Sequence, residues 1–198
     1  MDDTGLVEIV LHGREERNLE YKGGVSWGDS QINARITKTV LSMCNIQDGG
    51  AVVVGVEQQG QGFRTVGLDE SQLESFTQDG VSSHINEYAD PFVELSVSHV
   101  SHEGRNFVVI QVKEFAEIPV ICKKDGRLKL RKGAIYTRTR RMHESAEVPG
   151  QVEMREILDI AVEKNIRAFY RRVGRSGLEV IEPEAKDSKL FDEQLKGL

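Results

Sequence analysis

The sequence lacks features that define several broad classes of protein. Only two cysteines, Cys44 and Cys122, occur in 198 residues. They form no CxxC motif and have no paired histidines nearby, so no zinc framework is indicated. No run of roughly 18 apolar residues is present, so we expect no transmembrane helix. The first residues, MDDTGLVEIV, are acidic and lack the pattern of a signal peptide, and we therefore expect a cytoplasmic protein.

The overall charge and the missing motifs narrow the function further. The net charge is −6, so any binding to nucleic acid must come from a local basic patch. No serine lies in a GxSxG context, and Gly60-Gln61-Gly62 is too short for a phosphate-binding loop. Hydrophobic residues make up 38% of the chain and charged residues 29%, which is typical of a globular domain.

Hydrophobic periodicity predicts a mixture of helices and strands. Apolar residues with helical spacing predict helices over residues 30–45, 71–88 and 151–173. Alternating or continuous apolar runs predict strands over residues 18–24, 51–57, 92–100, 106–112, 119–122, 127–131 and 134–139. We therefore expect an α+β fold with a mixed, mainly antiparallel sheet, flanking helices and a C-terminal amphipathic helix.

Three segments are expected along the chain. Residues 1–149 form the domain, residues 150–176 form the amphipathic helix, and residues 177–198 form an acidic, polar tail. The apolar stripe of the last helix predicts packing on the domain or on a second copy. The tail is a candidate for docking a partner protein.

Glu15, Glu20 and Glu57 are candidate metal ligands. In an alternating strand, Glu20 and Lys22 share one face and Leu19 shares the other with Tyr21. If this strand pairs with the valine-rich strand, Glu20 and Glu57 converge, with Glu15 beside them. Clustered carboxylates suit a hard divalent cation such as Mg²⁺ or Mn²⁺. The alternative is that they are surface charges, with Glu20 paired to Lys22 or to an arginine.

A basic segment stands out in this acidic chain. We expect its exposed cations to contact phosphates and its tyrosine to stack on a base. The alternative is a solvated strand pair balanced by Glu144 and Glu147. The candidate residues are Lys123, Lys124, Arg127, Lys129, Arg131, Lys132, Tyr136, Arg138, Arg140 and Arg141.

Several motifs, in order, carry a resemblance to a known family. They are the pattern E-(x)4-E-Y-K from Glu15 to Lys22, the pattern N-(x)3-G-G from Asn45 to Gly50, the strand VVVGVE, the pair Pro119-Val120 and the segment LRKGAIYTR. Over residues 12–149 the chain resembles the Schlafen core domain, also described as the Schlafen AlbA-like domain.

The resemblance implies a function and a site. Some members of that family are metal-dependent endoribonucleases that cut structured RNA such as transfer RNA with three carboxylates. The matching positions here are Glu15, Glu20 and Glu57. Lys22 shares a strand face with Glu20 and is therefore a candidate cation to stabilise the scissile phosphate. The family often pairs two such domains to form a groove for RNA, so the resemblance also implies a homodimer. The third position is usually aspartate, and the longer Glu57 changes where a metal ion would sit.

Two other classes of function remain open. Many members of the family carry the domain as a module that binds DNA, RNA or a nucleotide without cutting it. The domain could also be an assembly subunit whose basic face meets an acidic protein. Carboxylates that converge favour cleavage, whereas carboxylates already locked by arginines favour these two alternatives.

Overall fold

The chain folds as an α+β domain with a mixed sheet, as the sequence predicts. The computed structural model describes residues 3–60, 62–141 and 143–176. The helices are α1 (Asp3–Leu11), α2 (Ser30–Met43), α3 (Glu70–Ser75), α4 (Gln78–Asn86) and α5 (Gln151–Ser176). The strands are β1 (Leu19–Lys22), β2 (Gly50–Val54), β3 (Val56–Gln59), β4 (Gly62–Thr65), β5 (Ala89–Asp90), β6 (Leu95–His102), β7 (Arg105–Val112), β8 (Ile121–Cys122), β9 (Tyr136–Arg138) and β10 (Ser145–Glu147).

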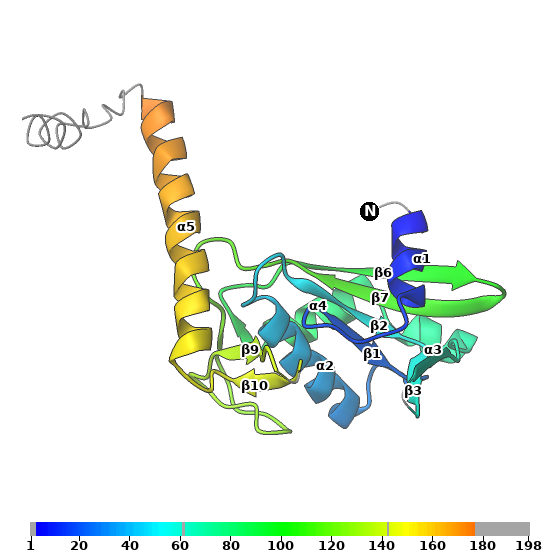
Figure 1. The fold of residues 1–198 in the computed structure, drawn as a ribbon. Helices are drawn as coiled ribbons and strands as arrows, with labels where there is room; N and C mark the ends of the chain where they lie inside the picture. The colour runs from blue at the N-terminus through cyan, green and yellow to red at the C-terminus, as the bar shows by residue number, and fades with distance from the viewer. Residues whose placement is uncertain (1–2, 61, 142, 177–198) are drawn as a thin grey trace, which may run out of the picture. The chain divides into compact units, whose positions relative to one another are not determined.

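The central sheet has the strand order β1-β2-β7-β6 (Figure 1). β1 runs parallel to β2, while the β2–β7 and β7–β6 pairs are antiparallel. A parallel pair needs a crossover connection, and α2 supplies it. Three two-stranded pairs accompany this sheet: β3 with β4, β5 with β8, and β9 with β10.

Both faces of the central sheet are covered, which accounts for the valine run of β2. Val52 packs into a cluster with Ile36 of α2. Val53 points to the opposite face, where it packs into a cluster with Leu6 and Val10 of α1. A strand buried on both faces has no need of alternating polarity.

The glycine pair after α2 is required by close packing of the backbone. Gly49 has φ +71°, and a Cβ placed there would lie 2.1 Å from the Val112 carbonyl oxygen. A Cβ on Gly50 would lie 2.6 Å from the Asn18 carbonyl oxygen. Only glycine fits where a backbone approaches this closely, so the pair lets β2 enter the sheet between β1 and β7.

Asn45 of the same motif is a structural residue. Its side chain is fully buried. The amide nitrogen donates to the carbonyls of Val120 at 2.8 Å and Tyr136 at 3.0 Å, and the amide oxygen accepts from the Val120 N–H at 2.8 Å. These bonds satisfy buried polar groups and tie the end of α2 to the segments before β8 and in β9.

Two predicted elements are interrupted. The strand predicted over residues 51–57 breaks at Gly55, whose φ of +106° ends β2 and starts β3 in a separate hairpin. The helix predicted over residues 71–88 is two helices, because buried Phe76 leaves the helical conformation and Thr77 caps α4. α1 and β10 are elements that the sequence did not predict.

The last helix, α5, follows the prediction in its position. The chain comprises two compact units, residues 1–162 and residues 163–198. The predicted tail, residues 177–198, lies outside the described residues. Among the residues described, no helix is long and apolar enough to cross a membrane.

Candidate functional site

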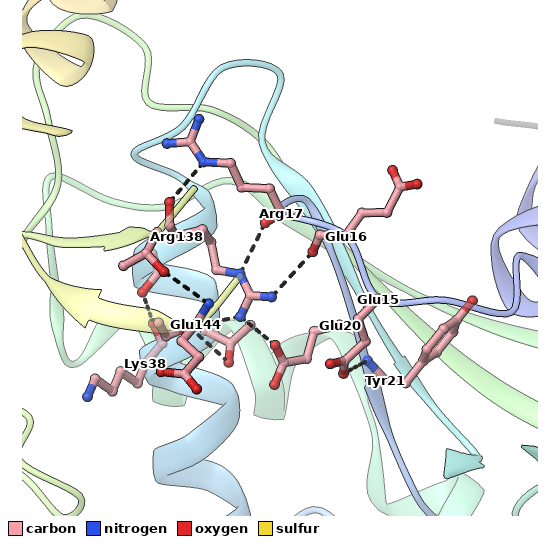
Figure 2. A network of polar contacts seen from close by, with 12 residues as sticks. Glu15, Glu16, Arg17, Glu20, Tyr21, Lys38, Arg138 and Glu144 are labelled. Atoms are coloured by element: carbon pink, nitrogen blue, oxygen red, sulfur yellow. Dashed lines mark hydrogen bonds and ion pairs between the residues drawn. The ribbon is translucent and has the colours of Figure 1, made fainter. Parts of the chain in front are cut away.

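A buried arginine lies at the centre of the site. Arg138 of β9 is 1% exposed, and its guanidinium forms an ion pair with the Glu20 carboxylate (Figure 2). Lys22 donates to the other Glu20 oxygen. The side chains of Glu20 and Lys22 share the less buried face of β1, as predicted. The Glu20 side chain is 14% exposed. Both of its oxygens are therefore occupied by cations in a partly buried setting.

Arg138 and Arg17 brace each other reciprocally. The Arg138 Nε donates to the Arg17 carbonyl at 3.0 Å, and the Arg17 Nε donates to the Arg138 carbonyl at 2.8 Å. Arg138 also donates to the carbonyl of Glu16 at 3.4 Å and to the hydroxyl of Ser145 at 3.3 Å. Its donors thus fix the entry to β1 against the β9–β10 pair.

The brace continues into α5. Arg17 makes a two-pronged ion pair with Glu156, with one of the contacts at 2.8 Å. Arg140 reaches the same carboxylate at 3.4 Å. Hydrogen bonding from Arg17 holds the pKa of Glu156 below its ordinary value. Bidentate arginine–carboxylate pairs are among the stronger charged contacts, so this one fixes the start of α5 to the domain.

The two glutamates before β1 have different partners. The Glu15 Oε1 accepts the Tyr21 backbone N–H at 3.0 Å. Glu16 forms a hydrogen bond with His12 at 2.9 Å and an ion pair with Arg14 at 2.7 Å. The hydrogen bond from His12 lowers the pKa of Glu16. Glu15 thus supports the backbone of β1, and Glu16 belongs to an exposed charged cluster.

Glu57 lies apart from the other two candidate carboxylates. It follows the break at Gly55, beside Gly23, and its side chain is 47% exposed with Arg64 at 3.9 Å. The prediction assumed one strand through residue 57, whereas the positive φ of Gly55 ends β2 and places Glu57 in β3, outside the cavity that Glu15 and Glu20 share. Within the part of the chain that the structure describes, no three potential ligand side chains are placed to hold a metal ion.

These residues do not fit a divalent cation as they are arranged. Glu20 is already neutralised by Arg138 and Lys22, one oxygen of Glu15 accepts a backbone N–H, and Glu57 is separate. A hard cation needs several free oxygen ligands, and neighbouring positive charges oppose its binding. The arrangement is that of carboxylates locked by basic side chains.

A cavity of about 590 Å³ opens beside this network. Its walls carry three carboxylates, four permanent cations and a histidine, so positive charge is in slight excess. The lining residues are Glu15, Glu20, Lys22, Arg35, Lys38, Thr39, Leu128, Arg138, His143, Glu144 and Ser145. Glu15 and Glu20 share this cavity, as predicted, and Glu57 is absent from its walls.

Tyr136 and Arg138 are not on a surface, which corrects the expectation that they contact nucleic acid. All three residues of β9 are buried, because the strand packs against α2 on one side and pairs with β10. The Tyr136 hydroxyl donates to the Lys129 carbonyl and accepts the Arg131 N–H, both at 2.8 Å. The tyrosine ring therefore has no free face on which a base could stack.

The strand predicted over residues 127–131 is absent. Leu128 and Lys129 have φ of +54° and +61°, which no strand accommodates. Buried Leu130 anchors the segment, and its carbonyl accepts the Gly126 N–H at 2.9 Å. Residues 123–132 thus form a compact loop, here called the cationic loop, in which Leu128 is exposed.

Besides buried Arg138, which pairs with Glu20, three basic residues of the predicted patch form ion pairs with carboxylates. Lys124 pairs with Glu87 at 2.5 Å, Arg131 with Glu147 at 2.6 Å, and Arg140 with Glu156 at 3.4 Å. The others are exposed, and none of them forms an ion pair with the residues that the structure describes. They are Lys123, Arg127, Lys129, Lys132 and Arg141.

Some residues of the site were not predicted from the sequence. Arg35, one turn before Lys38 on α2, lines the cavity, and so does Glu144. The spacing of Arg35 and Lys38 places both on one helix face, which could have identified them. The pairing of Arg138 with Glu20 had no local signal, since the two residues lie 118 positions apart.

Known proteins offer a second source of information on this chain. A search among curated proteins finds no significant match. Among solved structures, the DIP2311 protein from Corynebacterium diphtheriae is similar, with 16% identity and a TM-score of 0.47. The match covers 73% of this chain and only 26% of the length of the DIP2311 chain. The N-terminal domain of a RecG-related protein from Nitrosomonas europaea shows 19% identity and a TM-score of 0.45, over 76% of this chain and 98% of that one. Likeness at this level carries no functional argument.

The family match is more informative than either structure. It extends over residues 15–147, from the first candidate glutamate to the end of β10, and the description of the matching family is Schlafen, AlbA_2. Since this match covers more than half of the chain, the protein belongs to the Schlafen AlbA_2 family.

Proposed function

We propose that this domain binds nucleic acid through the cationic loop, without depending on the glutamates. The observation that carries the proposal is the set of four exposed cations in this loop, Lys123, Arg127, Lys129 and Lys132, which pair with no carboxylate among the described residues. In a chain of net charge −6, such a local excess suits a polyanion. A structured RNA such as transfer RNA is the expected partner.

The neighbouring cavity extends the same surface. Leu128 belongs both to the cationic loop and to the cavity wall, where Arg35 and Lys38 add two further cations. Phosphates spaced along a strand could contact the loop and α2 in succession. Binding of this kind is electrostatic and independent of sequence, so its strength falls steeply with salt.

Metal-dependent endoribonuclease activity, with Mg²⁺ or Mn²⁺ as cofactor, is the second candidate. The observation that favours it is that Glu15 and Glu20 line one cavity together with Lys22. Against it stand the ion pair between Glu20 and Arg138 and the separate position of Glu57. The binding module is therefore the better-supported function.

The experiment compares two variants of equal charge change. Arg127→Ala/Lys129→Ala/Lys132→Ala removes three cations of the loop, and Arg14→Ala/Arg64→Ala/Lys113→Ala removes three cations elsewhere. Fluorescence anisotropy of labelled transfer RNA, across a salt series in chelator, measures affinity. We expect about a tenfold or greater loss for the first variant, and a salt slope shallower by roughly 1 for each phosphate that the variant no longer neutralises. Equal losses in both variants would contradict the proposal.

Gel analysis of the same RNA with Mn²⁺ or chelator tests cleavage. Glu57→Gln is the sharper probe of the catalytic candidate, because Glu57 is exposed and its loss spares the fold. Glu20→Ala would be ambiguous, since it strips buried Arg138 of its counter-charge. Cleavage that requires metal and is lost in Glu57→Gln would replace the binding module with the nuclease.

We also propose that α5 pairs with α5 of a second copy in antiparallel orientation. Its exposed apolar residues Leu158, Val162, Ile166 and Phe169 recur every three or four positions, on one face of the helix. Residues 151–163 carry one arginine and four carboxylates, whereas residues 164–176 carry five basic residues and no carboxylate. Antiparallel pairing sets the acidic half of one helix against the basic half of the other.

Light scattering during size-exclusion chromatography tests this pairing. Phe169→Glu should convert the dimer to a monomer, because a charge in an apolar seam cannot be compensated. Phe92→Glu is the matched control, since Phe92 is also an exposed phenylalanine, at 68%. A monomeric wild-type chain, or loss of the dimer in both variants, would refute the pairing.

A further inference from the structure

Three aromatic rings gather where the loop before α2 meets α4. The rings of Trp27 and His84 lie edge to face, with centroids 5.5 Å apart and an interplanar angle of 89°. His84 also contacts Tyr88, at 5.6 Å between centroids. All three residues are half-buried, at the edge of the core rather than within it.

The cluster is held rigidly. The backbone N–H of Trp27 donates to the Ser75 hydroxyl at 2.8 Å, and the Trp27 ring packs on buried Phe76 at 5.8 Å between centroids. His84 lies in the last turn of α4 and Tyr88 lies four positions later. Burial lowers the pKa of His84, which favours the uncharged ring. A ring fixed before binding loses little entropy when a ligand stacks on it.

The cationic loop lies against this cluster. The Lys124 ammonium is 4.3 Å from the centroid of the Tyr88 ring. A Cβ on Gly126 would come within 2.7 Å of the same ring, so glycine lets the loop pack directly on it. The Lys123 N–H donates to the Tyr88 carbonyl at 2.8 Å.

A partly exposed aromatic beside a strip of unpaired cations is the combination that single strands require. Cations contact the phosphates, and a ring stacks on a base whatever its identity, because every base has an aromatic face. Paired bases in a helix are already stacked and offer no free face. Packing at the edge of the core would by itself explain Phe76 beneath Trp27, but not the adjoining cations.

We propose that Trp27, positioned by His84 and Tyr88, stacks on an unpaired base of a strand whose phosphates contact the cationic loop. The inference rests on the proposed nucleic-acid binding and adds its substrate class, which is single-stranded nucleic acid or the unpaired region of a structured RNA. It also assigns to Trp27 the stacking role that the sequence suggested for Tyr136.

The only tryptophan of the chain provides a direct probe. The full chain is titrated in chelator with a short oligouridine and, separately, with a duplex RNA of equal length, while Trp27 fluorescence is followed. We expect the oligouridine to quench the emission at saturation and the duplex to leave it nearly unchanged. Anisotropy of labelled oligouridine should show about a tenfold loss of affinity for Trp27→Leu, with Trp27→Phe within about twofold of wild type.

The outcomes separate this inference from the proposed function. Phe92→Leu is the control for loss of an exposed aromatic elsewhere, and circular dichroism checks folding. If Trp27→Leu fails to fold, the quenching of the wild type and the affinity of Trp27→Phe decide the matter. Oligouridine that binds without quenching, while the triple loop variant still loses RNA, would overturn the stacking site and leave the binding function. Absence of binding by any RNA would overturn both.

Discussion

Two charged regions of this domain use the same residue types in opposite ways. Around Glu20 and Arg138, each charge lies at least partly buried and is matched by a partner on another element. In the cationic loop, Lys123, Arg127, Lys129 and Lys132 extend into solvent with no carboxylate partner among the described residues. The first region stabilises the fold, and the second offers charge to a ligand.

The difference follows from the cost of removing water from a charge. A buried guanidinium is tolerated only when its donors are satisfied, so Arg138 is committed to Glu20 and to backbone carbonyls. An exposed lysine keeps its hydration and can exchange it for a phosphate. The position of a charged residue therefore says more about its role than its place in a motif does.

The largest expected effect comes from breaking the buried pair. Arg138→Ala should destabilise the domain by about 3–5 kcal/mol, because it removes several hydrogen bonds and one counter-charge of Glu20. Urea unfolding followed by circular dichroism measures the change. Arg141→Ala, which removes an exposed arginine three positions away, is the control. Similar midpoints for the two variants would show that the buried pair is dispensable.

A smaller effect is expected from the ion pair that fixes α5. The lowered pKa of Glu156 means that its contribution to stability is present above its ordinary pKa of 4.5 and is lost as pH falls through the lower folded-state value. Glu156→Gln should thus cost about 1 kcal/mol at pH 7, with a difference from wild type that shrinks as pH falls below 4.5. Thermal unfolding across this pH range measures it, and a difference that persists at low pH would contradict the assignment.

The smallest effect is expected from the exposed cations. Arg127→Ala/Lys129→Ala/Lys132→Ala should change the free energy of unfolding by no more than about 0.5 kcal/mol per substitution, since exposed side chains contribute little. The same variant is expected to lose most of its affinity for RNA. If the variant binds RNA weakly only because it is less stable, the loop cations stabilise the fold as the charges around Arg138 do. The contrast between the two regions would then be wrong.

Much of the fold could be predicted from local patterns. The alternation of Leu19 and Tyr21 with Glu20 and Lys22 identified β1 and its buried face. Helical spacing behind the Asp29 cap identified α2. The motif that begins at Asn45 is part of the family resemblance. In the structure, Asn45 makes buried hydrogen bonds, and the two glycines allow close packing of the backbone.

The rest depended on contacts between distant segments. The break at Gly55 requires a positive φ, which glycine permits but which its presence alone does not predict. This break places Glu57 in β3, outside the cavity that Glu15 and Glu20 line. Apolar and basic residues alternate in the cationic loop as they do in a strand, yet Leu128 and Lys129 take left-handed conformations. Tyr136 and Arg138 look like surface residues in sequence, and only the packing of β9 against α2 shows them to be buried.

The most direct test of the account is to map where RNA touches the protein. Transfer RNA would be crosslinked to the full chain by ultraviolet light in chelator, and the modified peptides identified by mass spectrometry. The account predicts crosslinks without metal in the peptides that span the cationic loop and Trp27, with none at Glu57. Crosslinks confined to the glutamate segments, and formed only when Mn²⁺ is present, would contradict it.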